Sequence, residues 1–452
     1  MTSSATEETL TEIIQGRLDN DRVTNVVARC LLRSNSALQT RESCRMLRFR
    51  RASYLDIESI MGLVLKLAAY EKCRDAVYVS TKTFRRDGFG TFPLFRCFLL
   101  EDTANDGSKT ACLPGLAVWY IAYSTWEGPV MFLEDVFIED SYRRRGVGTH
   151  LMYALTDIAI SLGCRRIMWQ TFDFNQVAKH LCKRLGAEIQ KDQLTLRLTR
   201  ESMVEFIKTR PAERTDPPTD KADDATKSTS FKNHGHVPRF DGRLDATSLE
   251  SVIDKCLELS NAELKMNIKS QSFRIRRAEE NDAKYILQFV EALAVFRKKS
   301  VAVHTTAENF ARDGFGDNPL YQCLLLEETG ANDGIPSLRG MTLWFIGYSS
   351  WEGRSLFLEE MFVDEEFRGR GAGKHFMYTL AEIAMTLDCG RFVWRALDWN
   401  TNALDFYQGI GAEIDRESLT VCFDWDKMEA FMKTREEKDD GTQCHCANCS
   451  HT

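Results

Sequence analysis

The sequence lacks an uninterrupted apolar run near the roughly 18 residues that a membrane-crossing helix needs. Its start, MTSSATEETL, is acidic and polar, where a secretory signal would be basic and then apolar. It also lacks an excess of positive charge, since the formal net charge is -7. Because binding to a phosphate backbone needs a basic surface, a general nucleic-acid binder is disfavoured. We therefore expect a cytoplasmic protein, with the nucleus as the alternative, and no nucleic-acid or membrane partner.

A disulfide framework is not indicated either. The 14 cysteines are scattered through 452 residues with no targeting segment before them, which favours reduced thiols. The exception is the tail CHCANCSH, where Cys444, Cys446, Cys449 and His451 lie in one short run. No second ligand pair at zinc-finger spacing accompanies them. We predict a disordered tail over residues 436–452 and no metal site.

What the sequence does contain is an internal repeat. DGFG begins at Asp87 and at Asp313, WEG at Trp126 and at Trp351, and the pattern R-x-x-G-x-G at Arg143 and at Arg368. Residues 132–189 and 357–414 align without a gap and share 25 of 58 positions. Solenoid repeats have periods of about 20 to 50 residues, so a period near 225 indicates a duplicated globular domain.

The repeat divides the chain into two predicted domains. The first copy spans residues 45–208 and the second copy spans residues 272–435. Before them lie a helical and flexible leader (1–44) and a helical lead-in (243–271), and between them a linker (209–242) rich in Pro, Asp, Lys, Thr and Ser that we expect to be disordered. Within each copy, alternating strand patterns come first, followed by strand-helix-strand-helix-strand. This order predicts an α/β (α+β) fold with a mixed, largely antiparallel sheet flanked by helices.

The glycine motif stands between a predicted strand and a predicted helix in both copies. Backbone amides at such a turn, together with the positive end of the helix, bind phosphate groups. Glycine permits positive φ and close approach, and arginine adds charge-assisted contacts. Arg368, Gly371 and Gly373 are therefore candidates for a pyrophosphate site. A dinucleotide-binding Rossmann domain is disfavoured, because the motif is not G-x-G-x-x-G and does not open the domain.

At this point the sequence resembles a known family. The order of a strand with LED, then R-x-x-G-x-G and a helix, then a strand ending in WN, then a helix with FYQGIGAE is similar to the GNAT superfamily of acetyl-CoA-dependent N-acetyltransferases. DGFG, the WxG turn and N-x6-Y-x3-GA are most similar to its spermidine/spermine and thialysine acetyltransferase group. The resemblance implies two tandem GNAT-like domains, each with acetyl-CoA in a splayed cleft between two strands.

The resemblance also implies roles for individual residues. Tyr407 would protonate the leaving thiolate as general acid, and Glu359 would bind the amine or help deprotonate it through water. Substrate-binding acids would be Glu359 and Glu360 and, in the first copy, Glu71, Asp75, Glu134 and Asp135. Cofactor contacts in the second copy would come from Met361, Phe362, Val363, Arg368, Gly369, Arg370, Gly371, Ala372, Gly373, Lys374 and Asn400. Those in the first copy would come from Val136, Phe137, Ile138, Arg143, Arg144, Arg145, Gly146, Val147, Gly148 and Thr149.

The two copies differ at the positions that matter for chemistry. Cys182 aligns with Tyr407, so the first copy lacks the predicted acid and is expected to be degenerate. The second copy has Arg297, Lys298 and Lys299 where the first has acids, and these cations would repel a polycationic amine. We therefore expect the second copy to be catalytic.

These complementary losses suggest an intramolecular pseudo-dimer in which the first copy supplies acids and the second supplies Tyr407; a homodimer is the other possibility. The predicted function is acetyl transfer to a small amine, either a diamine or polyamine or a thialysine-like amine. The alternatives are a non-catalytic acyl-CoA-binding regulatory module and a protein N-acetyltransferase.

Overall fold

The computed structural model describes residues 18–105, 112–210, 239–240, 242–267, 272–298, 302–329 and 337–439. Most of the predicted linker, the helix-like start up to residue 17, Lys299 and the cysteine tail from residue 440 lie outside these ranges. Within them, no helix has the length and apolar character that crossing a membrane requires. All 11 cysteines in the described part are free.

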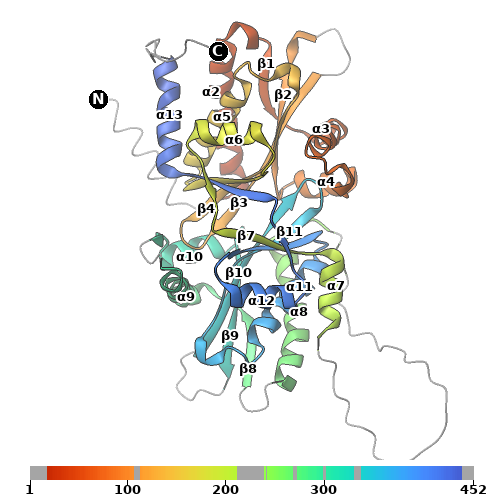
Figure 1. The fold of residues 1–452 in the computed structure, drawn as a ribbon, viewed down its shortest axis with the longest axis vertical. Coiled ribbons are helices and arrows are strands. Elements are labelled where there is room, and N and C mark those ends of the chain that lie inside the picture. The colour runs from red at the N-terminus through yellow and green to blue at the C-terminus, as the bar shows by residue number, and fades with distance from the viewer. Residues whose placement is uncertain are drawn as a thin grey trace, which may run out of the picture.

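Two mixed seven-stranded sheets form the centre of the molecule, which confirms the predicted fold class (Figure 1). The first sheet has the order β1-β2-β3-β4-β5-β14-β6 and the second has the order β8-β9-β10-β11-β12-β7-β13. The strands of the first copy are β1 (Leu47–Arg51), β2 (Arg96–Asp102), β3 (Cys112–Ser124), β4 (Gly128–Ile138), β5 (Arg166–Phe172), β6 (Glu188–Gln190) and β7 (Gln193–Thr199). Those of the second copy are β8 (Ser272–Arg277), β9 (Gln322–Thr329), β10 (Ser337–Ser349), β11 (Gly353–Val363), β12 (Arg391–Leu397), β13 (Glu413–Asp415) and β14 (Ser418–Asp424).

The last strand of each copy lies in the sheet of the other copy. Strand β7 pairs antiparallel with β12, from Gln193 opposite Leu397 to Thr199 opposite Arg391, and on its other side with β13. Strand β14 pairs in the same way with β5 and β6. Each sheet is therefore complete only when both copies contribute to it.

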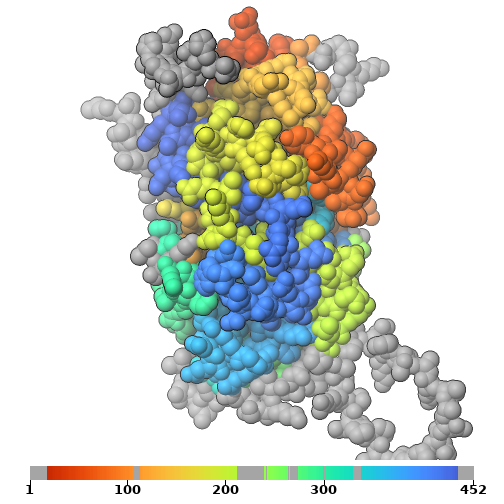
Figure 2. Space-filling view, viewed as in Figure 1, coloured from red at the N-terminus to blue at the C-terminus, as the bar shows by residue number. Residues whose placement is uncertain are grey.

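Helices cover the outer face of each sheet and follow the same exchange. Helices α2 and α5 of the first copy and α13 of the second share one apolar core, and α8 and α11 of the second copy share another with α7 of the first. Figures 1 and 2 show α13, in blue, in the upper half and α7, in yellow-green, in the lower half. The helices are α2 (Asn20–Gln39), α3 (Ile57–Tyr70), α4 (Thr81–Gly88), α5 (Val147–Ser161), α6 (Gln176–Leu185), α7 (Arg200–Lys208), α8 (Ala246–Asn267), α9 (Ala283–Phe296), α10 (Ala307–Gly314), α11 (Ala372–Thr386), α12 (Thr401–Gly409) and α13 (Trp425–Asp439).

A third apolar core joins the two copies. It contains side chains of α3, α4 and β3 together with those of α9, α10 and β10. Aromatic rings meet across it, with Tyr123 and Tyr321 4.6 Å apart and Phe95 and Tyr348 4.2 Å apart between ring centroids. Burial of such rings stabilises the contact in proportion to the apolar area removed from water.

The repeated WEG turns connect the copies through backbone hydrogen bonds. The amides of Tyr78 and Val79 donate to the carbonyl oxygen of Trp351 at 2.7 and 3.0 Å. In the same way, the amides of His304 and Thr305 donate to the carbonyl oxygen of Trp126 at 2.7 and 3.2 Å. The sequence identified WEG only as a repeated turn motif, and its role as a contact between the copies follows from the structure.

Candidate functional site

In each copy, two parallel strands separate partway along their length. Pairing of β4 with β5 ends at Leu133 and Trp169, and pairing of β11 with β12 ends at Leu358 and Trp394. Beyond these points β4 and β11 continue to residues 138 and 363 but pair only with their other neighbour. The backbone of 136–138 and of 361–363 thus borders an opening between strands, as the predicted acyl-CoA cleft requires.

A β-bulge brings two acidic side chains to the same face of the sheet at the start of each opening. The register of β4 shifts so that Glu134 has no opposite residue on β3. In the same way, Glu359 of β11 has no opposite residue on β10. A bulge reverses the alternation of a strand. Glu134 therefore lies on the same face as the adjacent Asp135, and Glu359 on the same face as Glu360, toward the core shared by the copies.

The glycine motif forms the turn into α5 and α11. Gly146 and Gly371 both have φ of +88° and stand immediately before these helices. Gly369 also has positive φ, and its equivalent in the first copy, Arg144, has a φ of +60°. For a residue with a Cβ atom this left-handed conformation costs about 1–2 kcal/mol. The Nε atoms of Arg143 and Arg368 donate to the carbonyl oxygens of Ile138 and Val363, tying the motif to the strand end. These turns at helix N-termini fit a pyrophosphate group.

The predicted cofactor residue Asn400 and its equivalent Asn175 cap the following helices. Their Oδ1 atoms accept from the amides of Ala403 and Ala178 at 3.3 and 3.1 Å. The hydroxyl of Tyr70, which the sequence did not single out, lies 3.5 Å from Oδ1 of Asn175. The amide nitrogen Nδ2 is then the atom that each asparagine can direct toward a ligand.

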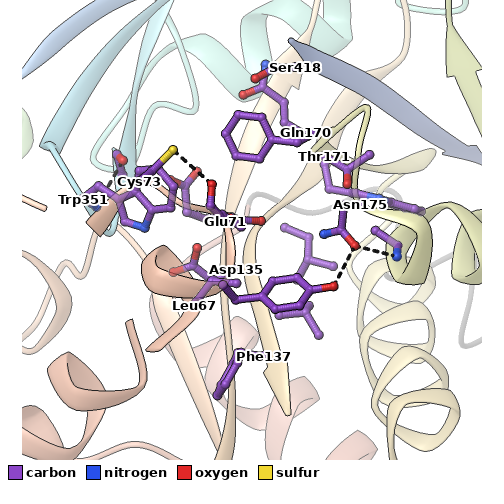
Figure 3. Close-up of a pocket in the computed structure, with 18 of the residues that line it drawn as sticks. Leu67, Glu71, Cys73, Asp135, Phe137, Gln170, Thr171, Asn175, Trp351 and Ser418 are labelled. Carbon is purple, nitrogen blue, oxygen red and sulfur yellow. Dashed lines mark hydrogen bonds between the residues drawn. The ribbon is translucent and has the colours of Figure 1, made fainter. Parts of the chain in front are cut away.

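A cavity of about 1780 Å³ occupies the opening of the first copy and extends to the second. Most of the predicted cofactor segments 136–138 and 143–149 line it, together with Trp351, Arg391 and residues 413–418 of the second copy. Figure 3 shows Glu71, Asp135 and Trp351 on one side and Thr171 and Asn175 on the other. Asp75 does not line this cavity and is exposed, so the structure separates it from the other predicted acids.

The acids of this cavity are crowded together. Burial, reinforced by the charge of Glu134, raises the pKa of Glu71 to about 7. Burial also raises the pKa of Asp135, and the charges of Glu134 and Glu71 act in the same direction. The guanidinium of Arg391, from the second copy, lies 3.7 Å from the carboxylate of Glu134. Such a concentration of carboxylates favours a bound cation.

In the second copy, arginines neutralise the equivalent acids. Arg297 donates to Glu360 at 2.8 Å, and Arg395 donates to Glu359 at 3.2 Å. Arg297 occupies the position of Glu71, and Arg395 aligns with Gln170 of the first copy. The sequence predicted that Arg297 would repel a cation but did not predict its ion pair. Comparison of WQTF with WRAL in the two copies would have drawn attention to Arg395.

Tyr407 and Cys182 have different surroundings. Tyr407 is 9% exposed, its ring lies 5.0 Å from that of Trp394, and burial raises its pKa, with the charge of Glu360 acting in the same direction. Cys182 is buried in the core under α5, and burial raises the pKa of its thiol. The charges of Glu360 and Arg297, both of its own copy, act on the pKa of Tyr407, and Tyr407 does not line the acidic cavity. The structure thus does not bring Tyr407 together with the acids of the first copy, as the pseudo-dimer hypothesis required.

Comparison with known proteins agrees with this geometry. The model of the acetyltransferase (GNAT) family matches residues 76–187 and 289–412. Thialysine N-epsilon-acetyltransferase of Bos taurus is 37% identical over 154 residues, covering 33% of this chain and 88% of that protein. Spermidine/spermine N(1)-acetyltransferase-like protein 1 of Homo sapiens is 34% identical over 167 residues, covering 36% of this chain and 24% of that protein.

Among solved structures, a GCN5-related N-acetyltransferase from Sphaerobacter thermophilus aligns with a TM-score of 0.41 and 11% identity, covering 84% of this chain and 96% of that one. The family match covers more than half of the sequence and falls in both copies, each of which contains the splayed strands and the glycine turn. The chain therefore belongs to the acetyltransferase (GNAT) family, with two tandem domains similar to the thialysine and spermidine/spermine acetyltransferase group.

Proposed function

We propose that this chain is an acetyl-CoA-dependent N-acetyltransferase that acts on a small amine, with transfer in the second copy and Tyr407 as general acid. The observation that carries the proposal is that the ring of Tyr407 lies 5.0 Å from that of Trp394, the last residue of β12 that pairs with β11 before the strands separate; Glu359 and Glu360 follow on β11. A proton donor and a carboxylate at the open end of parallel strands are the groups that acyl transfer to an amine requires.

Acetyl-CoA would supply the acetyl group as a reactive thioester. The backbone of Met361, Phe362 and Val363 would hold its pantetheine arm. The turn from Arg368 to Lys374 would bind the pyrophosphate, and Asn400 would donate from Nδ2. The equivalent segments 136–138 and 143–149, with Asn175, allow the first copy to hold the same group.

The proton transfers fall to Tyr407 and Glu359. Tyr407 is protonated at neutral pH, as a tyrosine already is at its ordinary pKa of about 10 and the more so where burial raises the pKa, so its Oη holds a proton for a departing thiolate. Glu359 would accept, through water, the proton that the substrate ammonium must lose before its nitrogen can attack, while Arg395 holds the carboxylate in place. Cys182 cannot replace Tyr407 in the first copy, since its thiol is buried in the core and does not line the cavity.

The substrate class follows from the acids. Relatives of this chain are named for thialysine, for spermidine/spermine and, in Arabidopsis thaliana, for L-ornithine, and all of these are small amines. We propose a substrate of this class. The first copy would bind a cationic amine at Glu71, Glu134 and Asp135 without turning it over. Mass spectrometry after incubation of the full chain with acetyl-CoA and either one of these amines or a peptide with a free amine should detect the N-acetylated amine. Acetylated peptide without acetylated amine would favour the alternative of a protein acetyltransferase.

The acidic cavity leads to a prediction about pH. Glu71 has a pKa of about 7, so it is mostly protonated at pH 6 and mostly charged at pH 8, whereas an alkyl ammonium stays charged across this range. The charge of Glu134 acts on Glu71, and Asp135, Glu352, Arg391, Asp415 and Glu417 are further ionisable groups of the same cavity. Affinity for putrescine, measured by titration calorimetry on the full chain, should therefore rise about tenfold from pH 6 to pH 8.

Glu71→Gln is the control for this prediction, since it removes the titrating group and keeps the shape of the side chain. It should bind putrescine weakly, with little change in affinity over the same pH range. An equal pH dependence in both proteins would show that Glu71 is not the titrating group.

A further inference from the structure

The ends of helices α3 and α9 carry opposite charges at one equivalent position. Glu71 directly follows α3 at Tyr70, and Arg297 directly follows α9 at Phe296. The residues after them, Lys72 and Lys298, both have positive φ, so the backbone follows the same path in both copies. The difference between the two sites is therefore one of side-chain chemistry on a shared frame.

In the second copy, the guanidinium of Arg297 is held by two groups. Its Nη2 donates to Glu360 at 2.8 Å, and its Cζ lies 5.4 Å from the ring centroid of Trp126 of the first copy. Glu360 is 3% exposed and also accepts from Thr125 at 3.3 Å. A carboxylate and an indole face thus enclose a positive charge that belongs to the protein itself.

The equivalent groups in the first copy enclose no such charge. Asp135 is the equivalent of Glu360, and Trp351 of the second copy is the equivalent of Trp126. Asp135 and Trp351 both line the open cavity. Glu71 adds a further carboxylate where the second copy has the guanidinium. Arg297 therefore fills, from within the chain, the position at which the first copy presents acids to a cationic ligand.

We propose that Arg297 determines which amines the second site accepts, because its guanidinium occupies the subsite for a second positive charge. This inference rests on the proposed function. The site then accepts an amine with a single positive charge, or one whose further ammonium is balanced by its own carboxylate, and it excludes diamines and polyamines. The exclusion has a direct cause: a second ammonium would meet the guanidinium at close range, and Glu360 is already paired.

The test compares butylamine with putrescine, which differ by one terminal amine. In the full chain, kcat/KM for acetylation of butylamine should exceed that for putrescine by about 10-fold to 100-fold. Arg297→Gln should reduce this preference to within a few-fold, and Arg297→Glu should reverse it. Arg297→Lys keeps the positive charge and should keep the preference.

Lys298→Glu is the matched control. It makes the same change of charge one residue away, at an exposed side chain. If it shifts the preference as much as Arg297→Glu does, general charge and not the paired guanidinium sets specificity, and the proposal is wrong. Circular dichroism and the melting temperature of each Arg297 variant show whether it folds as the unmodified chain does.

The two proposals fail in distinguishable ways. Absence of turnover with both amines in the unmodified chain overturns the proposed function, and the inference about Arg297 falls with it. Turnover that depends on Tyr407 but shows equal use of butylamine and putrescine, unchanged in Arg297→Gln, overturns only the inference about Arg297.

Discussion

Replacement of Tyr407 by phenylalanine is expected to lower kcat for amine acetylation by about 10², because a positioned proton donor contributes roughly 10²–10⁴ to such a step. The change removes one hydroxyl and keeps the ring that packs on Trp394. The fold should therefore be retained, with little change in the melting temperature. Initial rates of thiol release at saturating acetyl-CoA and amine measure the effect.

Two further variants act as controls for this result. Tyr348→Phe removes the hydroxyl of another buried tyrosine, one whose Oη has no hydrogen-bond partner among the described residues, and should leave kcat nearly unchanged. Cys182→Ala changes the equivalent position of the first copy and should also be active. Loss of activity in Cys182→Ala together with full activity in Tyr407→Phe would assign the chemistry to the first copy instead.

The largest expected effect on stability is at Asp87, where Asn should lower the free energy of unfolding by about 3–5 kcal/mol. Oδ1 of Asp87 accepts from Nη2 and Nε of Arg354 at 2.7 and 3.0 Å, and the side chains are 1% and 0% exposed. Arg354 also donates to the carbonyl oxygens of Leu387 and Gly242. Loss of the carboxylate leaves a guanidinium in the interior without its counterion, between the two copies.

The DGFG repeat provides the control for this prediction. Asp313 is the equivalent residue of the second copy, is also buried, and pairs with Arg312, whose side chain is 21% exposed. Because water can reach Arg312, Asp313→Asn should cost less, about 1–2 kcal/mol. Urea unfolding of both variants measures the difference. Equal costs would mean that the pair between Asp87 and Arg354 adds nothing beyond a local hydrogen bond.

Much of the fold was predictable because the duplication presents each helix and strand twice, in two different sequences that can be compared. Alternation identified the first strand of each copy, in RMLRFRRAS and SFRIRRAEE, and the repeated glycine motif marked the turn before α5 and α11. The exchange of β7 and β14 was not predictable. QLTLRLT (β7) and SLTVCFD (β14) have similar strand patterns, and the strands beside which they pair are also similar in the two sheets. The local sequence therefore does not specify which of the two sheets each strand joins.

The candidate site was predicted in its parts but not in its pairings. Tyr407, Glu359 and the glycine turn could be named from motifs, because each has a fixed spacing along the chain. The ion pair of Arg297 with Glu360 joins residues 63 positions apart, and the approach of Trp351 to the first cavity depends on how the copies pack. Neither of these contacts can be recognised from the residues next to it in the sequence. The sequence predicted that Arg297 would repel a polyamine, and the structure adds that its guanidinium is paired with Glu360.

The most direct test of the central claim, that this chain transfers acetyl groups to small amines, is thiol release from acetyl-CoA by the full chain. The panel is butylamine, putrescine, spermidine, spermine, lysine and thialysine, each compared with the rate without amine. We predict amine-dependent release that is greatest for butylamine or thialysine and lowest for spermine. Tight acetyl-CoA binding with no release above the amine-free rate for any of them would contradict the account and favour a non-catalytic acyl-CoA-binding module.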